Sequence, residues 1–207
     1  MWNKLSFLGL PVVLGFLVDQ VLGDPHSLYH PVQLIGKYID FFEKIFRSAL
    51  PKTKKGERAG GTLCAIFVIL VSTLLPWAVL FFLYHAELWT GASFGSEPAA
   101  VLHAIGFCLE TFWCCQIVAL KSLRDESMKV AKELEKGDLP AARRAVSMIV
   151  GRDTQNLTET GVAKAAVETV AENCSDGVIA PLLYLMLFGA VGGFFYKSVN
   201  TMDSMIG

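Results

Sequence analysis

The chain has 207 residues, of which 53% are hydrophobic and 18% charged, and its formal net charge is −1. Soluble domains carry roughly 25% charged residues, so this composition argues against a soluble protein and for one embedded in a membrane. The nearly balanced charge argues against a nucleic-acid partner. The cysteines show no metal-ligand spacing, and we interpret them as packing residues. They are Cys64, Cys108, Cys114, Cys115 and Cys174.

Three apolar stretches are predicted membrane helices, because a crossing helix needs about 20 apolar residues. The first, 5–22, is expected to be a retained helix rather than a cleaved signal peptide. The second, 62–84, contains no charge, and the third, 99–120, carries only His103 and Glu110 as acidic or basic side chains. Glu110 lies near mid-span, where it is either a functional group or a neutral acid that is hydrogen-bonded to a neighbouring helix.

A fourth apolar run, 178–196, is interrupted by four helix-disfavouring residues. They are Pro181, Gly189, Gly192 and Gly193. Each half is too short to cross a bilayer, so a re-entrant hairpin and a kinked helix are both open, and either needs cover from protein or water. The polar clusters that flank this run, 172–176 and 197–203, can share a site only if the path doubles back. We therefore predict a break near 189–193.

The distribution of lysine and arginine predicts the orientation in the membrane. Residues 23–61 hold seven of them, residues 121–177 hold nine, and residues 85–98 hold none. We expect a polar cytoplasmic loop at 23–61, a cytoplasmic subdomain at 121–177, and an external connection at 85–98. The N-terminus is then also external.

The subdomain 121–177 is predicted to contain three helices, since its apolar residues recur at helical spacing. Gly137 is expected to stop the first helix and Asp138 to cap the second. Asp153 or Thr154 is expected to cap the third, which should end near residues 175–177. No strand pattern is convincing, so the predicted fold class is all-α. We expect a polytopic integral membrane protein with a membrane region at 1–120, this helical cytoplasmic subdomain, and a broken or re-entrant segment at 178–207.

The third predicted helix of the subdomain carries an acidic face. Glu168, Glu172 and Asp176 are spaced by four residues, and like charges at this spacing destabilise a helix slightly. A bound Mg²⁺ would offset this repulsion, because Mg²⁺ favours carboxylate oxygens and often bridges to phosphates. The alternative is a solvated acidic face in which Lys164 pairs with Glu168.

Two more polar clusters lie near the ends of apolar segments. The first contains Asp19, Asp24 and His30, and the second contains Lys197, Asn200 and Asp203. A lone histidine is usually structural, whereas an aspartate in a membrane segment is either functional or simply exposed at the interface. If the second cluster is helical, it offers an amide and a carboxylate on one face.

Four motifs occur in a fixed order along the chain. They are Asp19-x4-Asp24-Pro25-x4-His30-Pro31-Val32, Gly151-Arg152-Asp153-Thr154, Glu168-x3-Glu172-Asn173-x2-Asp176-Gly177-x3-Pro181 and Lys197-x2-Asn200-Thr201-x-Asp203-Ser204-Met205-Ile206-Gly207. Together they resemble the CobD/CbiB group of cobalamin-biosynthesis membrane proteins, the adenosylcobinamide-phosphate synthases. The resemblance covers essentially the whole chain. Members of that group usually continue past the last motif, so the chain is expected to be a C-terminally truncated form.

The resemblance implies an ATP-dependent amide ligase that joins a carboxylate of adenosylcobyric acid to aminopropanol or its phosphate. An acyl phosphate is the expected intermediate, with ATP and Mg²⁺ required. The candidate residues are Glu172 and Asp176 for the metal; Arg152, Lys197, His30 and Asp24 for cofactor binding; and Asp153, Asn173, Asn200 and Asp203 for catalysis or positioning. The implied partners are the corrinoid, the amine, the lipid bilayer and other membrane proteins of the same pathway.

Two other functions are open on the residues alone. A transporter would suit the broken fourth segment and the mid-span Glu110. A membrane accessory protein without chemistry is the third possibility. No Gly-rich phosphate-binding loop of the Walker type occurs in the sequence, so a nucleotide would have to be bound in another way.

Overall fold

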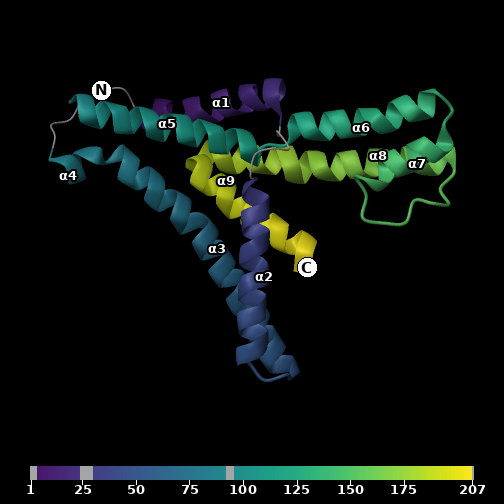
Figure 1. The fold of residues 1–207 in the computed structure, drawn as a ribbon, viewed down its shortest axis with the longest axis horizontal. Coiled ribbons are helices and arrows are strands. Elements are labelled where there is room, and N and C mark those ends of the chain that lie inside the picture. The colour runs from purple at the N-terminus through teal and green to yellow at the C-terminus, as the bar shows by residue number, and fades with distance from the viewer. Residues whose placement is uncertain (1–3, 24–29, 92–95, 207) are drawn as a thin grey trace.

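The computed structural model describes residues 4–23, 30–91 and 96–206. Within these ranges all regular secondary structure is helical and no strand occurs, which confirms the predicted all-α fold. Figure 1 shows α1 and α5 lying along each other, a helical subdomain at one end, and a projecting pair of helices formed by α2 and α3. The short α4 (Ala86–Thr90) follows α3 and lies at the end opposite the subdomain.

Among the residues that the structure describes, three helical stretches are long and apolar enough to cross a membrane, so the chain is a membrane protein. They are 54–84, 97–135 and 159–206. In α1 (Lys4–Leu22) the apolar part Gly9–Leu22 is shorter than a span, so crossing by this helix stays a prediction. Large apolar side chains point outward on all of these elements, as lipid contact requires. Examples are Leu17, Leu74, Trp77, Ile105 and Leu187.

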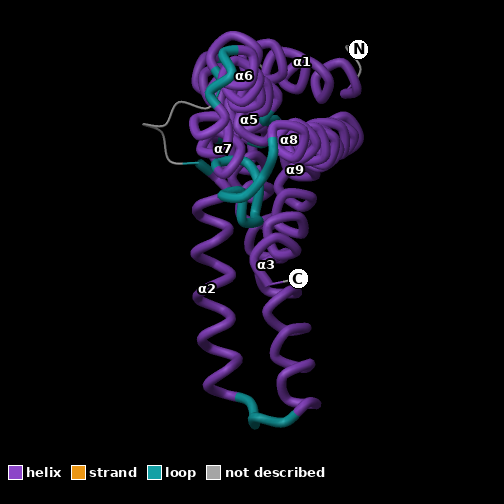
Figure 2. The backbone as a smooth tube through the Cα atoms, turned by 90° about the vertical axis from the view of Figure 1, so that its right-hand side faces the viewer, coloured by secondary structure: helices purple, strands orange, loops and turns teal. Residues whose placement is uncertain are grey.

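The helix α3 (Lys54–Tyr84) is longer than a bilayer core is thick. Its 31 residues span about 46 Å at the usual rise, against a hydrocarbon thickness of about 30 Å. Its charged first turns therefore extend beyond the apolar layer. Figure 2 shows these turns projecting from the rest of the molecule together with α2.

The predicted polar loop 23–61 is wrong in its secondary structure, because it contains α2 (Pro31–Ala49) and the start of α3. The helix α2 is amphipathic: Ile35 and Ile39 are buried against Val68 of α3 and Met202 near the C-terminal end of the described chain. Its apolar residues are interleaved with lysine, glutamate and arginine. The overall polarity of 23–61 favours a loop, whereas the helical period of its apolar residues favours the amphipathic helix that the structure contains.

The subdomain consists of α6 (Leu120–Glu135), α7 (Leu139–Ser147) and α8 (Glu159–Cys174) around a small apolar core. α6 follows α5 (Glu97–Ile117) after a short extended link. Two predictions are confirmed: Gly137 adopts a positive φ of 73° after α6, and Asp138 caps α7 by accepting from Ala141 N at 2.9 Å. The predicted cap of the third helix is wrong. Thr158 caps α8, accepting from Gly161 N at 3.1 Å, in place of Asp153 or Thr154.

The α-helical conformation of α8 ends at Cys174, next to the predicted end at 175–177. The prediction missed that helical structure continues there, through one π-helical turn, η1 (Ser175–Ile179), into α9 (Ala180–Ile206). The wider turn redirects a carbonyl: Gly177 O accepts a hydrogen bond from Ala119 N at 3.2 Å. The acidic end of α8 is thereby fixed to the link between α5 and α6. Single π-helical turns of this kind are frequent at functional sites.

The predicted break in the fourth apolar run is present at Gly189, whose φ of 64° and ψ of −161° are not helical. The chain doubles back there, because the ring centroids of Tyr184 and Tyr196 lie 5.2 Å apart. In a straight helix, residues at this separation in sequence would lie about 18 Å apart. Figure 1 shows the second half of α9 returning toward the subdomain end. A Cβ on Gly192 would lie 2.5 Å from the Cβ of Phe188, so the close return needs a glycine at that position.

Candidate functional site

The acidic face predicted on α8 is divided by an ion pair. Arg152 Nη2 donates to Glu168 Oε2 at 2.8 Å, and Lys164 Nζ lies 3.7 Å from Glu168 Oε1. The Arg152 guanidinium is the main reason that the pKa of Glu168 is lowered. Glu168 therefore belongs to an exposed ion pair, and Glu172 and Asp176 are left as the acidic pair at the junction with the π turn.

The loop that carries Arg152 and Asp153 is anchored on α7. Arg143 Nε donates to Leu157 O at 2.7 Å, and Thr154 Oγ1 donates to Arg143 O at 3.2 Å. Asp153 Oδ1 accepts from Gln155 N at 2.9 Å, which makes a local turn. Arg143 was not a predicted site residue. Its role depends on a contact across the subdomain, which no local pattern in the sequence signals.

The third group of predicted residues lies on the returning half of α9. Lys197 and Thr201 are buried, Asn200 is half-buried and Asp203 is exposed. Thr201 Oγ1 donates to Lys197 O at 2.7 Å. These side chains thus differ strongly in their access to solvent although they share one helix.

The hairpin turns the start of this group back toward the side of the acidic pair. Tyr196 precedes Lys197 in the chain, and its ring packs on that of Tyr184 in the first half of α9, with ring centroids 5.2 Å apart. The predicted doubling back is therefore confirmed, whereas a site shared by both clusters stays a prediction. Among the described residues, no hydrogen bond or ion pair joins Asn200 or Asp203 to Glu172.

The N-terminal cluster is partly structural. Asp19 is 0% exposed, so simple exposure at the interface is the wrong explanation for it, and its Oδ2 accepts from Lys121 N at 3.3 Å at the start of α6. His30 caps α2, with Nδ1 accepting from Val32 N at 3.2 Å. Asp24, the remaining predicted member, lies outside the described residues.

The acidic pair, Glu172 and Asp176, suits a magnesium site whose ligands come partly from a nucleotide better than one made of protein ligands alone. In the part of the chain that the structure describes, no three His, Cys, Asp or Glu side chains gather closely enough to hold a metal ion. Mg²⁺ is commonly held by one or two carboxylates together with waters and phosphate oxygens. Glu172 and Asp176 fit this arrangement, in which a nucleotide supplies the remaining ligands.

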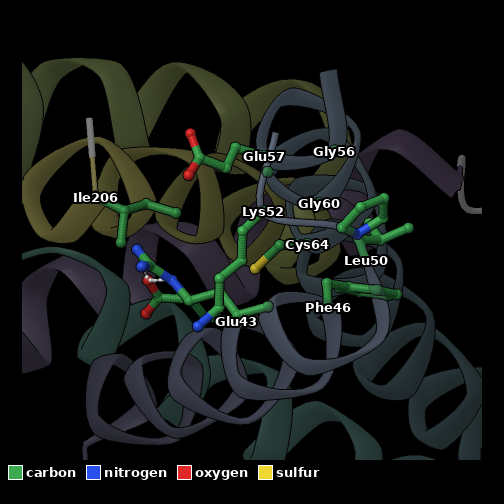
Figure 3. Close-up of a pocket in the computed structure, with 12 residues that line it drawn as sticks. Glu43, Phe46, Leu50, Lys52, Gly56, Glu57, Gly60, Cys64 and Ile206 are labelled. Atoms are coloured by element: carbon green, nitrogen blue, oxygen red, sulfur yellow. Dashed lines mark hydrogen bonds and ion pairs between the residues drawn. The ribbon is translucent and has the colours of Figure 1, made fainter. Parts of the chain in front are cut away.

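A separate groove of about 590 Å³ lies between α2, the first turns of α3 and the end of α9 (Figure 3). Its wall combines the apolar residues Phe46, Leu50 and Ile206 with charged residues, including the pair of Arg47 and Glu43 at 2.7 Å. None of the predicted site residues lines this groove. It is therefore distinct from the site predicted from the sequence.

Comparison with known proteins gives one family. The family model described as CobD/Cbib protein matches residues 12–207. Relatives named "Cobalamin biosynthesis protein CobD" are 42% identical in Geobacter metallireducens over 96% of this chain, 37% in Clostridium perfringens over 96%, and 40% in Listeria monocytogenes over 93%. The chain spans only 57%, 57% and 56% of these relatives, respectively. No solved structure matches. The chain therefore belongs to the CobD/Cbib family.

Proposed function

We propose that this chain is part of an adenosylcobinamide-phosphate synthase of cobalamin biosynthesis. The reaction is an ATP-dependent amide ligation between a carboxylate of adenosylcobyric acid and the amine of aminopropanol or its phosphate. Membership of a family whose relatives are named for cobalamin biosynthesis supports the pathway. One structural observation supports the proposed site: the break at Gly189 turns the chain back, so that Tyr196, which precedes Lys197, packs on Tyr184 of the first half of α9.

The chemistry requires an activated carboxylate, because a carboxylate oxygen is a poor leaving group. In the proposed sequence the substrate carboxylate attacks the γ-phosphorus of ATP, forming an acyl phosphate and releasing ADP. The amine then attacks the acyl carbon, the C–O bond to phosphate breaks, and the nitrogen loses a proton. Phosphate charge must be neutralised in the first step and a proton accepted in the second.

The described residues can supply these functions. Lys197 and Arg152 are the proposed phosphate-binding cations, and Arg152 is already held in place by Glu168. Asp203 is exposed on the returning half-helix and is the proposed proton acceptor. Asn173 and Asn200 have amide groups that can orient the reacting carboxylate or the amine.

Magnesium would be held by Glu172 and Asp176 together with phosphate oxygens of the nucleotide. When bound, it would supply positive charge that offsets the negative charge on the transferred phosphoryl group. The protein's own contribution at this position is the π turn, which fixes Asp176 next to Gly177 and its bond to Ala119.

We also propose that the site faces the cytoplasm of a cell with this protein in its inner membrane. The lysines and arginines of 23–61 and 121–177 support this orientation, since cytoplasmic loops are enriched in both residues. In Figure 1 the subdomain lies at one end of the molecule, and the described start of α1 and α4 lie at the other. Such an arrangement gives the site access to cytoplasmic ATP.

The test is a ligation assay on the full-length protein in detergent or nanodiscs. Adenosylcobyric acid, ATP, Mg²⁺ and either aminopropanol or its phosphate are incubated with the protein, and the amide product is sought by mass spectrometry. Product that depends on ATP and is lost in Asp176→Asn would support the proposal. Absence of product, together with uptake of a corrinoid into proteoliposomes, would instead support a transporter, which the broken α9 also suits.

A further inference from the structure

The break in α9 is contacted by a buried acid from another helix. Glu110 of α5 is 4% exposed, and its Oε1 accepts a hydrogen bond from Ala190 N at 3.5 Å. Its other oxygen, Oε2, accepts from the Tyr84 hydroxyl at 2.7 Å. One carboxyl group thus connects the last residue of α3, the middle of α5 and the first residue after Gly189.

The break creates a need for such an acceptor. Gly189 leaves the helical conformation, so the residues that follow it begin a new half-helix whose first N–H groups lack the usual intrahelical partners. Ala190 is 0% exposed, which leaves water no access to its backbone. An unsatisfied polar group in such surroundings is costly, and a carboxyl group near a helix N-terminus is favourable.

We propose that Glu110 is a positioning residue for the site. Its carboxyl group ties the start of the returning half-helix to α5 and, through Tyr84, to α3. The returning half-helix carries Lys197, Asn200 and Asp203, so its direction sets where these side chains lie relative to Asp176. The chemical role of the positioned groups rests on the proposed function, whereas the positioning itself does not.

A change at the break is amplified at the far end of the returning half-helix. Glu110 acts at Ala190, and Asp203 lies 13 residues farther along the same half-helix, or about 20 Å at the usual helical rise. A small rotation at the break therefore becomes a displacement of several ångströms at Asp203. Interface packing can resist part of it, because Ile117 contacts the position of Gly193. Glu110 adds a polar contact at the start of the half-helix to this apolar packing.

The experiment measures the position of the returning half-helix relative to α8 directly in the full-length protein. Spin labels are placed at Thr160→Cys on α8 and Ser204→Cys on the returning half-helix, both exposed positions, after replacement of the native cysteines. Distance distributions from pulsed electron paramagnetic resonance are compared for the parent protein, Glu110→Gln and Glu110→Leu. Glu97→Leu is the matched control, since Glu97 is exposed in the first turn of the same helix.

We expect Glu110→Gln to keep the narrow parental distribution, because the amide oxygen still accepts from Ala190. Glu110→Leu should broaden or shift it, with helix content unchanged by circular dichroism, and Glu97→Leu should leave it unchanged. Tyr84→Phe removes the hydrogen bond from Tyr84 to Glu110 and keeps the one from Ala190, so it should broaden the distance distribution less. This variant also serves as the test if Glu110→Leu does not fold. A parental distribution in Glu110→Leu, or in Tyr84→Phe where that variant is the test, would overturn the proposal.

The rate of the ligation reaction distinguishes a positioning role of Glu110 from a purely structural one. Glu110→Leu should lower kcat by about 10- to 100-fold with little change in KM for ATP, and Glu110→Gln should restore most of it. An equal loss in the Gln and Leu variants would contradict positioning by the acceptor oxygen. If the parent protein makes no amide product while the distance still responds to Glu110→Leu, the proposed function fails and the positioning role stands.

Discussion

The rings of Tyr184 and Tyr196 lie 5.2 Å apart at their centroids, although the two residues belong to one apolar segment and are separated by Gly189. Phe195 also packs on Tyr184, with ring centroids 5.9 Å apart. These contacts mean that the two halves of α9 run back along each other. The polar residues that precede and follow the segment therefore lie on the same side of the break.

The first prediction concerns the backbone at Gly189. Its φ of 64° and ψ of −161° fall in a region that is essentially restricted to glycine, so Gly189→Ala should destabilise the protein by about 1–3 kcal/mol. Gly61→Ala is the control: Gly61 lies within α3, and nothing within 4 Å would meet its Cβ. It should be neutral or slightly stabilising. Thermal unfolding of both variants in the same detergent measures the difference, and equal stability would refute the strained break.

The second prediction concerns the acidic pair. Glu172→Gln and Asp176→Asn should each weaken binding of Mg²⁺–ATP by about tenfold or more, because each removes a charged ligand. Glu159→Gln, on the same helix and also exposed, should bind like the parent protein. Titration calorimetry on the full-length protein gives the affinities. Unchanged binding in both site variants would reject the metal role and leave a solvated acidic face.

The third prediction concerns the ion pair of Arg152 and Glu168. Arg152→Ala should raise the pKa of Glu168 toward its usual value, since the Arg152 bond is the main cause of its lowering. A carboxyl group with a lowered folded pKa stabilises the fold above its unfolded pKa, and this contribution is lost as the pH falls through the folded value. The effect on stability should be small, because both side chains are exposed.

Nuclear magnetic resonance titration of the Glu168 carboxyl carbon, selectively labelled, measures this change. Lys164→Ala is the control, because Lys164 makes the longer contact of 3.7 Å and should shift the Glu168 pKa less. A larger shift in Lys164→Ala than in Arg152→Ala would contradict the assignment. If Arg152 also binds phosphate, Arg152→Ala should weaken ATP binding while stability is nearly unchanged.

The fourth prediction concerns orientation. In sealed right-side-out vesicles, a membrane-impermeant thiol reagent should not label Cys174 until the membrane is permeabilised, since Cys174 ends α8 on the proposed cytoplasmic side. A cysteine introduced at the exposed Glu97 in a background lacking native cysteines should be labelled in sealed vesicles. Labelling of Cys174 before permeabilisation would reverse the orientation and remove the site from cytoplasmic ATP.

The sequence by itself determined the features that depend on neighbouring residues. Long apolar runs required burial in lipid, glycine at 137 followed by aspartate at 138 ended one helix and began the next, and the glycines of the fourth run required a break. These features follow from hydropathy and from backbone sterics, which act over a few residues. The order of motifs likewise indicates the family without reference to any contact in the fold.

Only the tertiary structure decided the features that depend on distant contacts. The amphipathic α2 is held by the apolar sides of α3 and α9, the π turn is fixed by Ala119, and Arg152 takes Glu168 out of the acidic face. In each case the partner lies far away in the sequence, so no local period or propensity contains it. The bond from Ala190 to Glu110 spans 80 residues and exists only because the backbone at Gly189 frees a donor that a straight helix would have satisfied internally.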